Sequence, residues 1–238
     1  MWNNPRLLNA VAGFLTALGA LAFLGAGLHL LLQSPVFPLR EVAVRGVLAK
    51  TAREDIEHAM QSRISGNFFA ADLGVIRGAL EQLPWVRRVE VRRAWPDRIE
   101  IALEEHVALA RWGDKALVNV QGERFAAASD ADLPRFSGPD GTEQDVTRRY
   151  RRFAELVAPL GVSVERVTLS SRRAWQLAVS SGLQLELGRD LPGNPPEARL
   201  ARFVGAYPAT LARISRAHEN VDLRYPNGFA LRVPEFKG

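Results

Sequence analysis

The chain has 238 residues, and its 31 Lys and Arg against 26 Asp and Glu give a formal net charge of +5. It contains no cysteine, which excludes a disulfide framework and thiol catalysis. The positive charge comes almost entirely from arginine, because the only lysines are Lys50, Lys115 and Lys237. An arginine excess favours anionic contacts, namely nucleic acid, an anionic membrane surface or an acidic protein.

Residues 7–32 form the first predicted element and contain no Asp, Glu, Lys or Arg. Their length exceeds the roughly 20 residues that a helix needs to cross a bilayer. A cleaved signal peptide has a shorter apolar run, of about 7 to 15 residues, and a small-residue cleavage site. A buried core helix normally carries polar residues along one face. The sequence therefore predicts one transmembrane helix, with residues 1–6 on one side of the membrane and the remaining chain on the other.

The sequence that follows the apolar segment predicts a strand and then a helix. Val42 and Val44 indicate a short strand that ends at a turn at Gly46. Thr51 and Glu54 have the spacing of a capping box, in which each side chain accepts a hydrogen bond from the other residue's backbone amide. We therefore expect a helix to begin there.

A second helix and two strands complete this part of the chain. Asp72 is placed to cap the second helix, and Pro84 ends it. Apolar and polar residues then alternate along 86–91 and again along 99–103, with a turn at 95–98 between them. Two helices on one face of a small three-stranded sheet make a self-sufficient α+β unit.

These motifs, in this order, resemble the POTRA domain of the FtsQ/DivIB family of bacterial cell-division proteins. The resemblance covers residues 37–106 and lies directly after the predicted membrane helix, as in that family. Two interpretations fit the arginines on the predicted hairpin. They contact an anionic partner or, more simply, they lie on a solvent-exposed face of the sheet. The matching motifs are Asn67-Phe68-Phe69, Leu83-Pro84-Trp85-Val86, Val89-x-Val91-x-Arg93-x-Trp95-Pro96 and Ile101-x-Leu103-x-Glu105.

Residues 107–238 predict a second, β-rich domain with flanking helices. The expected elements are a hairpin within 112–125, a turn-rich break at 134–141, a helix at 145–160, strands at 162–169, 175–179 and 183–187, a helix at 197–207, and strands at 221–225 and 229–233. This order resembles the β domain of the same family. The motifs that carry it are Gly138-Pro139, Arg172-Arg173-x-Trp175, Leu187-Gly188, Arg202-Phe203 and Val221-Asp222-Leu223-Arg224-Tyr225.

No catalytic or metal-binding constellation emerges from the sequence. It lacks a nucleophile elbow, a zinc-protease helix, a phosphate loop and a dinucleotide fingerprint. The four histidines are scattered without ligand spacing. Glu104, Glu105 and His106 are consecutive in a strand, so their side chains alternate between faces and do not converge on one substrate atom. We therefore expect no enzyme activity, cofactor, metal or small-molecule substrate.

The last predicted strand supplies a binding mechanism without catalysis. A terminal strand after a tight hairpin tends to lie at a sheet edge, where its unpaired amides and carbonyls accept a partner segment as an extra strand. The resemblance implies that the partners are FtsB and FtsL, within an FtsQ–FtsB–FtsL complex. The predicted partner-binding residues are Arg172, Arg173, Arg224, Tyr225, Asn227, Gly228, Phe229, Leu231 and Val233.

The resemblance also implies a location and a role. It implies a single-pass inner-membrane protein at the division septum, with a cytoplasmic N-terminus and a periplasmic body. Such a body does not meet nucleic acid. The implied role is a divisome scaffold that helps to control septal peptidoglycan synthesis. The alternatives are a membrane-tethered envelope enzyme and a POTRA-type translocation chaperone, although no series of lipid-facing strands of an outer-membrane barrel is present.

Overall fold

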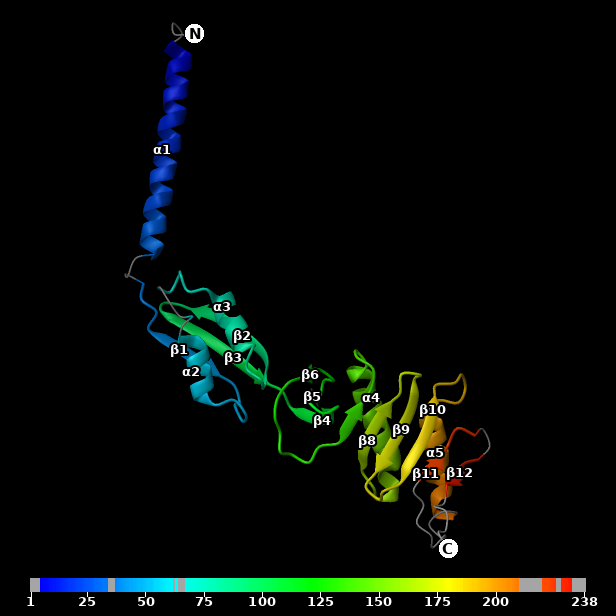
Figure 1. Cartoon of the computed structure of the whole chain (residues 1–238). Coiled ribbons are helices and arrows are strands. Elements are labelled where there is room, and N and C mark those ends of the chain that lie inside the picture. The colour runs from blue at the N-terminus through cyan, green and yellow to red at the C-terminus, as the bar shows by residue number, and fades with distance from the viewer. Residues whose placement is uncertain are drawn as a thin grey trace. The chain divides into compact units, whose positions relative to one another are not determined.

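A computed structural model describes residues 5–33, 37–61, 63, 67–209, 220–225 and 228–232 (Figure 1). The chain divides into two compact units, Met1–Glu105 and His106–Gly238, which are described separately. The α+β class is confirmed, and so is the strand-helix-helix-strand-strand order expected after the membrane helix.

Helix α1 (Pro5–Gln33) is the predicted membrane segment. It has 29 residues, and at about 1.5 Å per residue it is longer than the roughly 30 Å hydrocarbon core of a bilayer. Residues Pro5–Leu31 are apolar enough to cross a membrane, and none of the most apolar window is buried inside the protein. This exposure distinguishes α1 from the core helix of a soluble domain.

The rest of the first unit is a three-stranded sheet with two helices. Its elements are β1 (Glu41–Arg45), α2 (Arg53–Gln61), α3 (Leu73–Leu80), β2 (Val86–Ala94) and β3 (Arg98–Glu105). The strand order is β1-β3-β2, with β1 parallel and β2 antiparallel to β3. Asp72 caps α3 as predicted, because its Oδ1 accepts hydrogen bonds from the amides of Gly74 and Val75 at 2.8 and 3.1 Å. Ile76, Leu80, Ile99 and Ile101 are completely buried in the core.

The capping box predicted at Thr51 and Glu54 is wrong, although the helix forms. Helix α2 begins at Arg53, and the Thr51 hydroxyl accepts no capping bond. The Thr51 amide instead donates to a carboxylate oxygen of Glu105 at 2.6 Å. The amides of Ala49 and Lys50 donate to the same carboxylate, at 2.8 and 3.1 Å. A residue 54 positions away therefore satisfies the amides before the helix, which local spacing does not reveal.

We expect Glu105→Gln to lower the free energy of unfolding at pH 7 by about 2 kcal/mol, because a charge-assisted acceptor is lost. Partial burial raises the pKa of Glu105, but hydrogen bonds from Thr51, Ala49 and Lys50 outweigh burial and hold the pKa below its ordinary value of 4.5. A depressed carboxyl pKa stabilises the fold above the unfolded-state pKa, and this contribution is lost as pH falls through the folded-state pKa.

Thermal unfolding of the purified chain in detergent at pH 7 and at pH 3 checks this prediction. The difference between the wild-type chain and Glu105→Gln should shrink as the pH is lowered through the folded-state pKa and Glu105 gains a proton. Glu104→Gln is the matched control, because the Glu104 side chain is 51% exposed and pairs with Arg87 across the surface. An equal effect of the two substitutions would contradict the role assigned to Glu105.

The arginines of the β2–β3 hairpin divide into two groups. Arg87 pairs with Glu104 and Arg92 with Glu100, both with shortest distances of 2.6 Å, as expected for a solvated face. Arg93 differs, because its guanidinium donates to backbone carbonyls of Phe68, Phe69 and Ala71 at 2.9, 3.1 and 2.7 Å. Arg93 therefore holds the segment before α3 in place, and only the first group confirms the solvated-face interpretation.

The described residues of the second unit form a nine-stranded sheet and two long helices. The strands are β4 (Ala108–Trp112), β5 (Ala116–Asn119), β6 (Arg124–Phe125), β7 (Arg135–Ser137), β8 (Val164–Leu169), β9 (Ala174–Val179), β10 (Gln184–Arg189), β11 (Asn220–Asp222) and β12 (Ala230–Arg232). The α-helices are α4 (Glu143–Val157) and α5 (Pro196–Ala206), followed by short 3-10 turns at Ala158–Leu160 and Tyr207–Ala209. The strand order is β12-β11-β10-β9-β8-β7-β4-β5-β6.

The turn-rich break predicted at 134–141 is wrong in one respect, because it contains strand β7. This strand pairs in parallel with both β4 and β8 and so lies within the sheet. Its central residue, Phe136, is 1% exposed. Three residues between Pro134 and Gly138 carry too little pattern to indicate a strand, and the sheet on both sides overrides their local preference.

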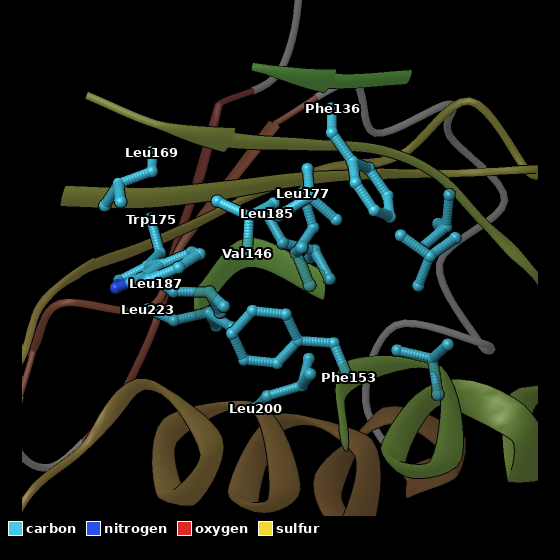
Figure 2. Packing of buried hydrophobic residues seen from close by; sticks show 14 of the residues in the cluster. Phe136, Val146, Phe153, Leu169, Trp175, Leu177, Leu185, Leu187, Leu200 and Leu223 are labelled. Atoms are coloured by element: carbon cyan, nitrogen blue, oxygen red, sulfur yellow. The ribbon is translucent and has the colours of Figure 1, made fainter. Parts of the chain in front are cut away.

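Helices α4 and α5 pack against one face of this sheet (Figure 2). Phe153 of α4 contacts Trp175 of β9 edge to face, with ring centroids 5.9 Å apart. Leu200 and Phe203 of α5 are buried in the same core. Alternate residues such as Gln176 point away from the helices and are exposed, so the opposite face of the sheet is polar.

Candidate functional site

The last strand lies at the edge of the nine-stranded sheet, as predicted. Strand β12 pairs antiparallel with β11, and within the described part of the chain no strand pairs with its other side. The strand is short, and Phe229 and Leu231 pack partly against the core. Two of the predicted partner-binding residues, Asn227 and Val233, lie outside the described residues.

Strand β11 supports this edge by pairing in parallel with β10. The Leu223 amide extends the pairing by donating to the Glu186 carbonyl at 2.9 Å. Val221 and Leu223 are buried at 0% and 3% exposure, and they anchor β11 over α5. Phe229 contacts Phe203 edge to face, with centroids 5.6 Å apart. The edge is therefore fixed by apolar contacts on the helix side, while no described strand pairs with its outer backbone.

The strand register shows which predicted residues come together. Trp175 pairs with Gly188, and Glu186 pairs with Asp222, so the start of β9 and the end of β11 lie at the same end of the sheet. Arg172 and Arg173, just before β9, are exposed there. They are separated from β11 by β10.

We use the term β12 edge for β11, β12 and residues 223–225 and 228–229. Arg224, Tyr225, Gly228, Phe229 and Leu231 belong to it. No contact of Arg172 or Arg173 with Arg224 is found among the described residues. The structure thus brings five of the predicted residues together and places the arginine pair nearby.

Arg224 carries a local network of charges at this edge. Its Nε donates to Asp222 Oδ1 at 2.8 Å, its Nη2 donates to Asp222 Oδ2 at 2.5 Å, and Glu186 Oε2 lies 3.6 Å from Nη2. The hydrogen bond from Arg224 holds the pKa of Asp222 below its ordinary value, and the same bond raises the pKa of Arg224. Both groups therefore stay charged at neutral pH, and Arg224 presents a fixed cation at the end of the edge.

A groove lies on the helix side of the edge, with a volume of about 340 Å³. Its floor includes Phe203 and Leu223, and Tyr225 stands close by along the chain with 54% of its surface exposed. Tyrosine and arginine, which occur together in this part of the chain, are enriched at interface hot spots. The groove residues are Arg199, Arg202, Phe203, Ala206, Leu223, Gly228 and Phe229.

Arg199 is a supporting residue that the sequence did not reveal. It is 2% exposed, and it donates to the carbonyls of Leu187, Arg189 and Asn194, the last two at 2.9 and 2.7 Å. Burial lowers its pKa. In the sequence it reads as an ordinary polar position of a helix, since its partners belong to β10 and the following loop.

Glu104, Glu105 and His106 each have structural partners. Glu105 accepts the three amides described above, and His106 stacks on Phe125 with centroids 4.0 Å apart. Within the described ranges, no group of three or more His, Asp or Glu side chains is arranged to hold a metal ion.

An apolar helix long enough to cross a membrane, a small strand-helix-helix-strand-strand unit and a β-rich unit define a membrane-anchored protein with two folded domains. Comparison with known families agrees, because the FtsQ-type POTRA domain matches residues 37–106 and the C-terminal domain of cell division protein FtsQ/DivIB matches residues 110–224. The chain belongs to the FtsQ/DivIB family of cell division proteins.

Similar proteins span nearly the whole chain. Cell division protein FtsQ of Burkholderia pseudomallei is 44% identical over 236 residues, covering 98% of this chain and 94% of that protein. The proteins of the same name from Nitrosospira multiformis and Bordetella pertussis are 40% and 38% identical, each over 98% of this chain and over 99% and 93% of their own lengths. The family places this chain in the bacterial cell division machinery.

Proposed function

We propose that this chain is a non-enzymatic divisome scaffold that binds FtsB and FtsL and so helps to control septal peptidoglycan synthesis. Residues 1–6 form a cytoplasmic tail, 7–32 span the inner membrane, and the POTRA domain at 37–106 and the β domain at 107–238 lie in the periplasm at the septum. The observation that carries the proposal is the position of β12 at the end of the sheet order. The identity of the partners is inferred from membership of the FtsQ/DivIB family.

Binding proceeds by addition of a partner strand to β12. The outer amides and carbonyls of β12 pair with an extended segment of FtsB. Hydrogen bonds to the partner backbone then replace their hydrogen bonds to water. Tyr225 covers part of the added segment, and Arg224 attracts an acidic side chain at its end. Arg172 and Arg173 extend the positive charge at the same end of the sheet.

The membrane helix raises the strength of this interaction. A partner anchored in the same bilayer meets the β12 edge at a high effective concentration, so moderate affinity at the edge suffices for assembly. A scaffold of this kind needs no reaction centre, and the structural roles of Glu105 and His106 agree with that.

Replacing Tyr225 by glutamate tests this function. We expect Tyr225→Glu to reduce recovery of FtsB by at least about tenfold, because a hot-spot side chain contributes about 2 kcal/mol or more. The fold should remain, since the Tyr225 side chain is 54% exposed. The measurement is a pull-down of FtsB and FtsL with the full chain from membranes of cells that produce all three proteins.

Trp95→Glu is the matched control, because it also replaces an exposed aromatic side chain, 79% exposed, by a carboxylate. It should leave FtsB recovery unchanged. The proposal fails if Tyr225→Glu keeps wild-type recovery, or if Trp95→Glu reduces recovery as strongly.

A further inference from the structure

Three arginines on neighbouring strands form a continuous row across the polar face of the second unit. Arg111 of β4 pairs with Arg135 of β7, and Arg135 pairs with Arg166 of β8. Their strand neighbours Trp112, Phe136 and Val167 are buried toward the helices. Since side chains alternate between the faces of a strand, the three guanidinium groups extend from the opposite face. We call these three residues the arginine row.

The row has no acidic partner among the described residues. Arg111 donates to two neutral acceptors, the carbonyls of Ser129 at 2.6 Å and Ala131 at 3.2 Å. The side chains of Arg135 and Arg166 make no hydrogen bond or ion pair with any residue that the structure describes. In the same unit, three other arginines, Arg124, Arg149 and Arg224, each pair with a carboxylate.

This arrangement is unfavourable without a ligand. Paired residues of adjacent strands lie about 4.8 Å apart, and like charges at such positions destabilise a sheet. A bound anion would remove that repulsion and gain charge-assisted hydrogen bonds. The row therefore has the character of a binding site, because the side chains of Arg135 and Arg166 gain no compensating ion pair from the described part of the fold.

A groove of about 360 Å³ lies along the row. Ser137, Gly113 and the acidic residue Asp114 line it beside the arginines. The backbone amides of the lining strands are already used, since Arg111 N donates to the Pro134 carbonyl at 2.8 Å and Gly113 N to the Phe136 carbonyl at 3.0 Å. Recognition here therefore depends on guanidinium groups, without the nest of backbone amides that typifies phosphate sites.

We propose that the arginine row binds an acidic segment of a protein partner, whose Asp or Glu carboxylates accept hydrogen bonds from Arg135 and Arg166. The planar fork of arginine matches a carboxylate in a bidentate pair. A second row of paired residues lies beside the arginine row on the same face and consists of Ser137, Thr168 and Gln176. Their side chains offer polar contacts to an extended chain. This site is separate from the β12 edge, because it uses β4, β7 and β8.

Binding of a fluorescent hexaglutamate peptide to the full chain in uncharged detergent tests the proposal. At low ionic strength, we expect the double variant Arg135→Gln and Arg166→Gln to bind hexaglutamate at least about tenfold more weakly than wild type, because two charge-assisted contacts are lost. The matched control is the double variant Arg53→Gln and Arg148→Gln, which removes the same charge from exposed helix positions. It should change the affinity less than twofold.

Three further readouts make the outcome decisive. Hexaglutamine should not bind, and Tyr225→Glu should leave hexaglutamate binding intact, which separates this site from the proposed function. Without peptide, the Arg135 and Arg166 double variant should unfold at the wild-type temperature or above, because repulsion is removed.

Equal losses in both double variants, or no binding of hexaglutamate to wild type, would overturn the proposal. Binding of inorganic phosphate or phosphatidylglycerol vesicles that depends on Arg135 and Arg166, in the absence of hexaglutamate binding, would also overturn it and assign the row to phosphate groups.

Discussion

Arg199→Ala is expected to lower the free energy of unfolding of the second unit by about 3 kcal/mol, because several buried carbonyls lose their donor and a cavity is left. Its guanidinium bonds three carbonyls, those of Leu187, Arg189 and Asn194. The first two belong to the end of β10, and Asn194 lies in the loop before α5. One side chain therefore ties the supporting strand of the β12 edge to the helix beneath it.

Thermal unfolding of the full chain in detergent measures this effect. Arg148→Ala is the control, because Arg148 is an exposed position of α4 and should cost less than about 0.5 kcal/mol. Arg199→Lys keeps the positive charge but lacks the planar guanidinium group. Its free energy of unfolding should therefore lie between those of the wild-type chain and Arg199→Ala. If Arg199→Ala unfolds at the same temperature as the wild-type chain, water replaces the guanidinium group without loss of stability, and the expected result is contradicted.

The consequence for partner capture follows from the sheet order. Strand β11 pairs with β10 on one side and β12 on the other. Loosening the end of β10 therefore loosens β11, and FtsB recovery should fall with Arg199→Ala even though Arg199 is almost completely buried. This loss should grow with temperature, unlike the loss caused by Tyr225→Glu.

Local patterns predicted most of the elements because the relevant interactions are local. The alternation along 86–91 and 99–103 corresponds to β2 and β3, and the Asp72 cap is formed as the spacing requires. The apolar length of residues 7–32 predicts α1 without any tertiary information. These features depend on neighbours in the sequence.

The errors and omissions all involve partners distant in the sequence. Glu105 replaces the predicted capping box by binding amides at 49–51. Strand β7 exists because β4 and β8 lie on either side of it. Arg199 finds its acceptors in β10 and the following loop.

The sequence did not indicate the register of the sheet either. The prediction included a last strand at an edge, but the parallel pairing of β10 with β11 decides what lies beside it. The same holds for the arginine row, which combines residues from three separate segments, at 111, 135 and 166. Sequence alone indicated an excess of arginine and gave no reason to connect these three.

Gly188→Val is expected to destabilise the second unit by about 3 kcal/mol, because strain and collision act together. Gly188 lies buried in a bulge of β10 with φ at +75°, a conformation that a β-branched residue strongly disfavours. A Cβ atom at this position would lie 2.8 Å from Arg224 Cγ and 3.2 Å from Arg199 Nη1. The substitution therefore displaces both arginines that organise the β12 edge.

Gly182→Val separates the two causes. Gly182 also has a positive φ, +83°, but a Cβ atom there would meet no atom within 4 Å. Its substitution measures strain alone, at about 1 to 2 kcal/mol. The difference between the two variants in thermal unfolding then reports the collision, and it should shrink when Arg224→Ala is added to Gly188→Val, because contacting residues couple. Equal destabilisation by Gly182→Val and Gly188→Val would mean that Arg224 moves aside freely, in which case the pairing of Arg224 with Asp222 does not fix the edge.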